Sequence, residues 1–173
     1  MTGDEIDRYL VVGVTPKQPL TVIRQAARFA RQFQALLVCA NVEAGSYVVS
    51  EHPDGSVESR PIDPDQPDWN TAVFDGGLAD QIRALAQEES IRVEFRELAG
   101  DIGHALGRLA EILDAEMIIV GSRRGGLRST MHEFFGGSVA AHLAHRQPRP
   151  VVVVPLPALE PGRTHSQERE PRS

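Results

Sequence analysis

The sequence predicts an α/β domain in which one five-stranded parallel sheet is covered by helices on both faces. Two observations predict this fold class. Short apolar runs rich in β-branched residues alternate with segments that carry apolar residues at every third or fourth position, as in successive βα units. Four of the five runs lack the polar alternation of a half-exposed strand, which is typical of strands buried in a parallel sheet. The 173 residues are enough for one such domain.

The first expected unit is a strand, a helix and a second strand. YLVVGV at residues 9–14 and ALLVCANV at residues 35–42 are the two strands. Residues 20–34 lie between them and carry apolar side chains at helical spacing, which predicts an amphipathic helix. Cys39, the only cysteine, falls inside the second apolar run. An intrachain disulfide is therefore excluded, and a packing role in the core is expected.

The next part of the chain changes character before the pattern resumes. Residues 43–74 are rich in proline, glycine and acids and predict a long variable loop, in which Asp54 and Gly55 favour the turn of a small hairpin. A helical pattern follows at residues 77–90. IRVEFREL at residues 91–98 alternates strictly, which indicates a half-exposed strand near a sheet edge.

Two more strands complete the predicted sheet. Asp101 is placed to cap a helix over residues 102–113, and MIIV at residues 117–120 is the fourth strand. After a glycine-rich segment, residues 139–146 have a short helical pattern, and RPVVVVP at residues 149–155 is the fifth strand. A strand order of 3-2-1-4-5 would give a doubly wound, Rossmann-like sheet.

Composition limits where the protein works and what it binds. The domain is expected to span residues 9–155, after an extension of residues 1–8 and before a disordered tail of residues 156–173, which is rich in proline and charge. The formal net charge of −6 argues against nucleic-acid binding. No apolar run approaches the roughly 20 residues that span a bilayer, and the N-terminus has no signal-peptide core. We therefore expect a cytoplasmic protein without a membrane partner.

The glycine-rich segment GSRRGGLRSTMHEFFGGS, residues 121–138, is the candidate binding site. Glycines let backbone N–H groups approach a ligand closely, and a helix N-terminus adds free N–H groups and a positive dipole end, so a phosphate would fit. In a 3-2-1-4-5 sheet this segment also lies at the switch point where ligands bind. Glycines that only form turns are the alternative. The single lysine, Lys17, is not beside these glycines, which excludes a P-loop.

This layout, together with VGSRRGGLRST and FFGGSVAAHLAHRQPRPVVVVP, resembles the universal stress protein family over residues 9–155. Members that bind ATP carry the pattern G-x2-G-x9-G-[ST], whose glycines and final Gly-Ser surround the phosphates. An acidic residue after the first strand contacts the nucleoside, and a residue at the end of the second strand contacts adenine. The resemblance therefore implies an ATP site, with or without Mg²⁺, and a role in stress adaptation.

The family pattern can be carried onto this chain residue by residue. Gly121 matches its first glycine, and Gly137 with Ser138 matches its last pair. Val139 would supply the next backbone N–H. The nucleotide-binding residues that the resemblance implies are Val14, Thr15, Val42, Gly121, Arg123, Arg124, Gly125, Gly137, Ser138 and Val139.

Two departures from the family pattern favour a second interpretation. Arg124 holds the position of the middle glycine, and eleven residues rather than nine separate Gly125 from Gly137. Thr15 stands where the family has an aspartate, and a hydroxyl cannot replace a charged acceptor. The two arginines of the loop could stabilise a polyphosphate or be solvated. The alternative function is thus a dimeric interaction module that binds no nucleotide and works through residues 43–74.

The sequence also bears on catalysis and on assembly. Neither Ser122 nor Ser138 lies in a G-x-S-x-G elbow, and no cysteine or acid accompanies His142 and His145 at metal-ligand spacing, so we expect no enzyme and no metal site. The exposed edge of the fifth strand would favour aggregation unless it were covered. In the family this strand commonly pairs with its copy, so the resemblance implies a homodimer through Val151, Val152, Val153 and Val154.

Overall fold

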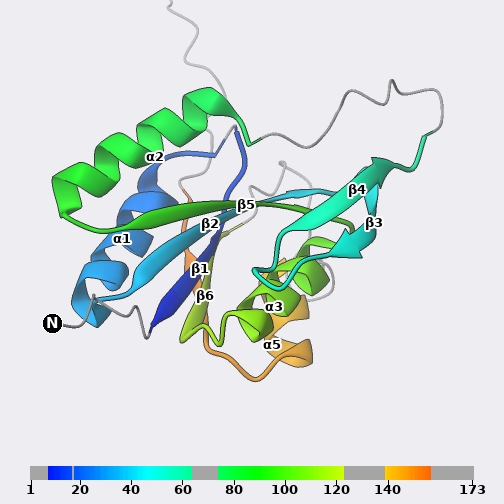
Figure 1. The fold of residues 1–173 in the computed structure, drawn as a ribbon. Helices are drawn as coiled ribbons and strands as arrows, with labels where there is room; N and C mark the ends of the chain where they lie inside the picture. The colour runs from blue at the N-terminus through cyan, green and yellow to red at the C-terminus, as the bar shows by residue number, and fades with distance from the viewer. Residues whose placement is uncertain (1–7, 17, 64–73, 123–138, 157–173) are drawn as a thin grey trace, which may run out of the picture.

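The computed structural model describes residues 8–16, 18–63, 74–122 and 139–156. Its centre is a parallel five-stranded sheet in the order β5-β2-β1-β6-β7 (Figure 1). Counted along the chain without the separate hairpin described below, this is the predicted order 3-2-1-4-5, which is confirmed. The strands are β1 (Tyr9–Gly13), β2 (Leu36–Glu43), β5 (Val93–Ala99), β6 (Met117–Gly121) and β7 (Val151–Val154).

Helices cover both faces of the sheet, as the sequence predicts. Helices α1 (Thr21–Phe33) and α2 (Gly76–Glu89) pack on one face, and α3 (Ile102–Ile112) and α5 (Val139–Arg146) pack on the other. The predicted cap of α3 is confirmed, because the Asp101 side chain accepts a hydrogen bond of 2.8 Å from the backbone N–H of His104. Sequence and local hydrogen bonding therefore agree on where this helix begins.

Two apolar clusters, one on each face, form the core. Successive residues of a strand point to opposite faces, so Val12 packs toward α1 and α2 while Val11 packs toward α3 and α5. Cys39 is fully buried in the first cluster, and burial raises the pKa of its thiol to about 12. The predicted packing role of this cysteine is confirmed.

The expected loop after β2 contains a substantial hairpin. Strands β3 (Ser46–Glu51) and β4 (Val57–Pro61) pair antiparallel, and Gly55 in their turn has a φ of +80°. The predicted hairpin is thus confirmed. The backbone N–H of Ile62 donates to the carbonyl of Gly45 at 2.9 Å and closes the base of the hairpin. We call residues 45–62 the arm; it lies beside α3, outside the main sheet (Figure 1).

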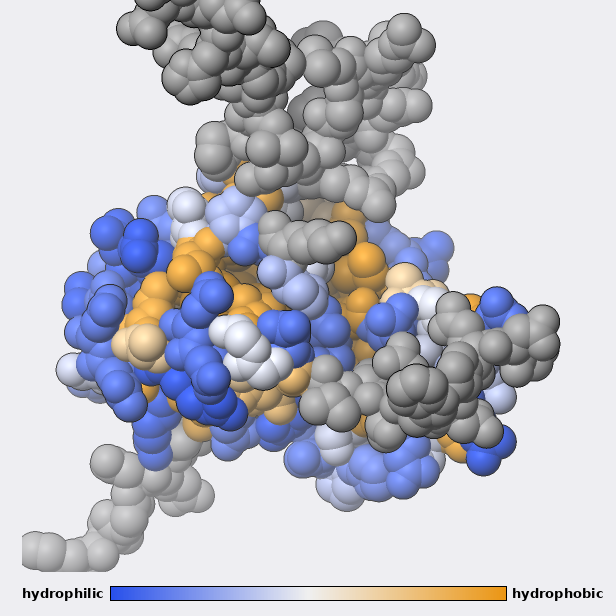
Figure 2. Space-filling view, turned by 90° about the horizontal axis from the view of Figure 1, so that it is seen from above, coloured by the Kyte–Doolittle hydropathy of each residue, from blue (hydrophilic) through white to orange (hydrophobic). Residues whose placement is uncertain are grey.

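The described residues expose few large apolar side chains. Seen from above, hydrophilic residues surround apolar atoms in the middle of the molecule (Figure 2). Large apolar side chains that are exposed lie mostly on the arm, and the remaining one of those described is on β7, which pairs with β6 at an edge of the sheet. These exposed side chains are Tyr47, Val48, Val49, Ile62 and Val153. At the opposite edge β5 pairs with β2, which confirms the predicted edge strand.

Candidate functional site

The strand order reverses direction between β1 and β6, and this switch point is the candidate binding site. The two strands are paired in parallel, with Val12 opposite Ile119, so their carboxyl ends lie side by side. The loop after β1 and the first residues after β6 therefore meet at the carboxyl ends of the strands, where ligands bind in doubly wound folds. Thr15 lies in the first of these loops and is exposed, and its carbonyl accepts a 3.0 Å hydrogen bond from the backbone N–H of Gln18.

The structure places three of the expected ligand contacts on two different faces of the sheet. Val42 and Val139 are half-buried and pack against the cluster beneath α3 and α5. The Val14 side chain is only 2% exposed and packs into the opposite cluster, while its backbone N–H donates to Ala40 at 2.9 Å. Val42 and Val139 thus lie on the face of the sheet that α3 and α5 cover. The buried Val14 side chain offers no surface to a ligand.

Gly121 is the last residue of β6 and is closely surrounded by the protein itself. A Cβ at this position would lie 3.0 Å from Gln18 Nε2, 3.0 Å from Val22 Cγ2 and 3.2 Å from Leu156 Cδ1. The space next to Gly121 on the α1 face is therefore filled by side chains. Close packing alone therefore favours glycine at this position.

Ser122 links the start of the glycine-rich segment to the end of β7. Its backbone N–H donates to the carbonyl of Val154, and its hydroxyl accepts from the backbone N–H of Leu156, both at 2.8 Å. These bonds fix the direction in which the chain leaves β6. The remaining predicted contacts lie outside the described residues, and these are Arg123, Arg124, Gly125, Gly137 and Ser138.

Three polar side chains near the carboxyl ends of the strands were not singled out by the sequence analysis. The Nε2 atom of Gln18 is buried and has no hydrogen-bond partner in the part of the chain that the structure describes. Asn41 Nδ2 donates to Glu97 Oε2 at 3.0 Å, between paired positions of β2 and β5. Burial raises the pKa of Glu97, and the hydrogen bond from Asn41 opposes that shift. Their position at the carboxyl ends of expected strands was the available signal.

Of the two histidines of α5, His142 lies against the start of α3. His142 Nδ1 is 3.4 Å from Asp101 Oδ1, and its ring occupies the space that a side chain on Gly103 would need. His145 lies in the last turn of the helix, where the helix dipole favours it. Within residues 8–16, 18–63, 74–122 and 139–156, no three His, Cys, Asp or Glu side chains are grouped so as to hold a metal ion.

Comparison with known proteins adds to this geometry. The model of the universal stress protein family matches residues 8–155. The chain belongs to this family. No curated protein matches it. In the part that the structure describes, no helix combines the length and apolarity that crossing a membrane requires.

Solved structures of universal stress proteins share the fold. One, in complex with cAMP, is 21% identical with a TM-score of 0.57, and the match covers 85% of this chain and 95% of the other. A second, from Archaeoglobus fulgidus in complex with dAMP, is 17% identical with a TM-score of 0.53 and coverages of 86% and 98%. A family protein from Arabidopsis thaliana with AMP bound is 14% identical, with a TM-score of 0.51 and coverages of 90% and 96%.

Proposed function

We propose that this universal stress protein binds an adenine nucleotide, with ATP as the expected ligand, and regulates stress adaptation. The observation that carries the proposal is the switch point of the strand order between β1 and β6, where the glycine-rich segment leaves the sheet directly after Gly121. Structures with the same fold contain cAMP, dAMP and AMP, which supports an adenine nucleotide as the class of ligand.

The described residues suggest how the site between β1 and β6 would hold each part of the nucleotide. Val42 offers apolar surface for the adenine ring, and the exposed Thr15 hydroxyl can exchange a hydrogen bond with the ribose. Helix α5 spans Val139–Arg146, and the positive end of its dipole suits the phosphates. Arg123 and Arg124 follow Gly121 closely in the sequence and would add charge-assisted hydrogen bonds. Mg²⁺, where present, would bind through the phosphate oxygens.

We propose binding rather than turnover as the role of this site. The Ser122 hydroxyl, one residue after Gly121, accepts a hydrogen bond from the Leu156 backbone as part of the β6–β7 connection. A nucleophilic serine needs a neighbouring general base instead. A regulatory role follows, in which the bound nucleotide changes what the protein contacts.

The direct test starts with the protein as purified, without added nucleotide. One sample is denatured, and the released small molecules are identified by mass spectrometry. A second, native sample is titrated with ATP by calorimetry. We expect adenine nucleotide in one of the two measurements. Gly137→Val should abolish binding without unfolding the domain, because its side chain would occupy phosphate space. Gly76→Val is the control, since a Cβ at Gly76 meets nothing within 4 Å. Unchanged affinity of Gly137→Val would contradict the assignment.

A second candidate function is a dimeric interaction module that binds no nucleotide. The observation that favours it is the arm, which carries four of the five exposed large apolar side chains among the described residues. The homodimer itself would form through Val151 to Val154 of β7, whose member Val153 is 45% exposed. If no adenine nucleotide co-purifies and none binds at millimolar concentration, this second function is the one to pursue.

A further inference from the structure

The arm touches helix α3 at two separate points. At its turn, Gly55 approaches so closely that a side-chain Cβ would collide with Leu109 Cδ1 of α3. At the end of β3, Glu51 forms a two-pronged ion pair with Arg108 of α3, with Nε to Oε2 at 3.2 Å and Nη2 to Oε1 at 2.9 Å. A two-stranded hairpin is marginally stable alone, so these contacts, together with the 3.1 Å hydrogen bond from Arg96 Nε of β5 to the Asp54 carbonyl, hold the arm in place.

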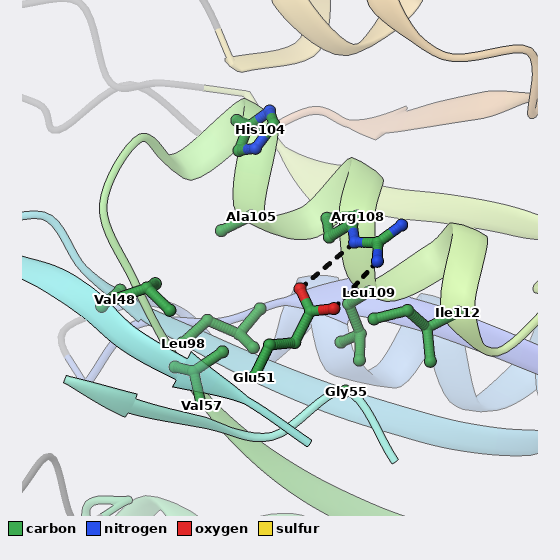
Figure 3. A pocket seen from close by; sticks show the side chains of 11 residues that line it. Val48, Glu51, Gly55, Val57, Leu98, His104, Ala105, Arg108, Leu109 and Ile112 are labelled. Atoms are coloured by element: carbon green, nitrogen blue, oxygen red, sulfur yellow. Dashed lines mark hydrogen bonds and ion pairs between the residues drawn. The ribbon is translucent and has the colours of Figure 1, made fainter. Parts of the chain in front are cut away.

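A cavity of about 160 Å³ remains between the arm, the end of β5 and α3 (Figure 3). Figure 3 shows the Glu51–Arg108 ion pair crossing from the arm to the helix beside it. His104, in the first turn of α3, also lines the cavity. Most of the wall is apolar, and its larger apolar side chains are Val48, Val57, Leu98, Leu109 and Ile112.

The charged groups of the cavity are already matched within the protein. Both carboxylate oxygens of Glu51 accept hydrogen bonds from Arg108, and a further guanidinium N–H donates to Glu111 at 2.9 Å. An anionic ligand would have to displace Glu51 from Arg108, and a cationic ligand would bury its charge against apolar side chains. The electrostatics therefore favour an uncharged occupant.

The apolar wall supplies a reason for an occupant of that kind. The space is open to solvent, and apolar side chains that water still reaches gain free energy when another apolar surface covers them. Val48 faces the cavity from the arm and is still 44% exposed, so a ligand would cover it. An engineered apolar cavity of roughly 150 Å³ in another protein takes up benzene, which sets the size of molecule that this space can hold.

We propose that this cavity is a second binding site, which takes a small uncharged apolar molecule about as large as phenol. None of its lining residues is among those assigned to the nucleotide, so the proposal does not depend on the proposed function. The two contacts with α3 define the cavity, because they keep the arm close to the helix at both ends. Occupancy would add contacts between the arm and α3 and so strengthen their association.

Methyl NMR spectra of the full chain test the proposal with phenol as the probe. We expect saturable shifts of the methyl groups of Val48, Val57 and Leu109, with a Kd on the order of 1 mM, as suits a ligand of this size. Benzoate has nearly the same shape but carries a charge, and it should bind at least about tenfold more weakly. Shifts that do not saturate, or shifts confined to Val42 and Val139 of the proposed nucleotide site, would overturn the proposal.

Two substitutions that fill the cavity complete the experiment. Ala105→Leu adds volume from α3, and Val48→Phe adds it from the partly exposed arm, where the domain core is not disturbed. Each should weaken phenol binding about tenfold or more. Val49→Phe is the matched control, because Val49 is the next residue, is 52% exposed and does not line the cavity. The site would be refuted if Val48→Phe bound phenol as well as the natural chain does, or if Val49→Phe lost as much phenol affinity as the two cavity-filling variants.

Discussion

Replacing Gly121 with alanine measures how tightly the end of β6 is packed. The new Cβ would lie 3.0 Å from Val22 Cγ2 and 3.2 Å from Leu156 Cδ1, whereas carbon atoms prefer separations of about 3.5–4.0 Å. Val22 is fully buried in α1, so its side chain has little room to yield the few tenths of an ångström that the new Cβ requires. Inserting a methyl group into a packed core costs about 1–3 kcal/mol.

Part of this cost is offset in the unfolded chain. Gly121 is not among the described residues with positive φ, so alanine adopts its backbone conformation without strain and reduces unfolded-state entropy, a gain of about 0.4–1 kcal/mol. We therefore expect Gly121→Ala to be less stable than the natural chain by roughly 1–2 kcal/mol. For a chain of this size the melting temperature should fall by about 2–8 °C.

Urea and thermal unfolding followed by circular dichroism will measure this difference. Gly76→Ala is the control, because a Cβ there meets nothing within 4 Å and the same gain in the unfolded state applies. It should match or slightly exceed the stability of the natural chain. If Gly121→Ala proves as stable as Gly76→Ala, the packing argument is wrong, and Gly121 must be explained by its ligand instead.

Three further predictions follow from burial, charge and exposure. Cys39 should resist a thiol reagent in the native protein at about pH 8 and react fully in urea, because its pKa is raised to about 12; rapid native labelling would contradict its burial. Arg108 holds the pKa of Glu51 below its ordinary 4.5, so this carboxylate stabilises the fold above that pH and the contribution is lost as pH falls through the lowered pKa. Urea unfolding of Glu51→Gln should therefore show a deficit at neutral pH that shrinks in acid, and a deficit independent of pH would count against the ion pair. Val153→Lys should convert the proposed dimer to a monomer in sedimentation at micromolar concentration, whereas an intact dimer would exclude β7 as its interface.

The sheet could be predicted because each strand carries its environment in its own pattern. Residues 117–120 are apolar throughout and form part of a central strand buried on both faces, while the strict alternation of residues 91–98 matches the edge strand β5. The arm was predicted only as a small hairpin. Its packing on α3 includes the contact of Glu51 with Arg108, 57 residues away, and such a contact leaves no periodic signal in a sequence.

The candidate site could be predicted in position more readily than in detail. The fold rule placed it after β1 and β6, and Thr15 does lie there, exposed. The buried side chain of Val14 also follows from alternation, since it shares a face with Val12. The crowding of Gly121 could not be foreseen, because it depends on how the Gln18 side chain folds back onto the sheet.

The closure of the arm at its base has a consequence for how such a chain can change over time. Because the Gly45–Ile62 hydrogen bond joins its two ends, the arm enters and leaves the domain at nearly one point. Its length and composition can therefore vary, or the whole segment be exchanged for another, without altering the pairing of the five central strands. A hairpin attached in this way can be exchanged as a unit, so a domain of this kind can acquire new specificities while its central sheet stays the same.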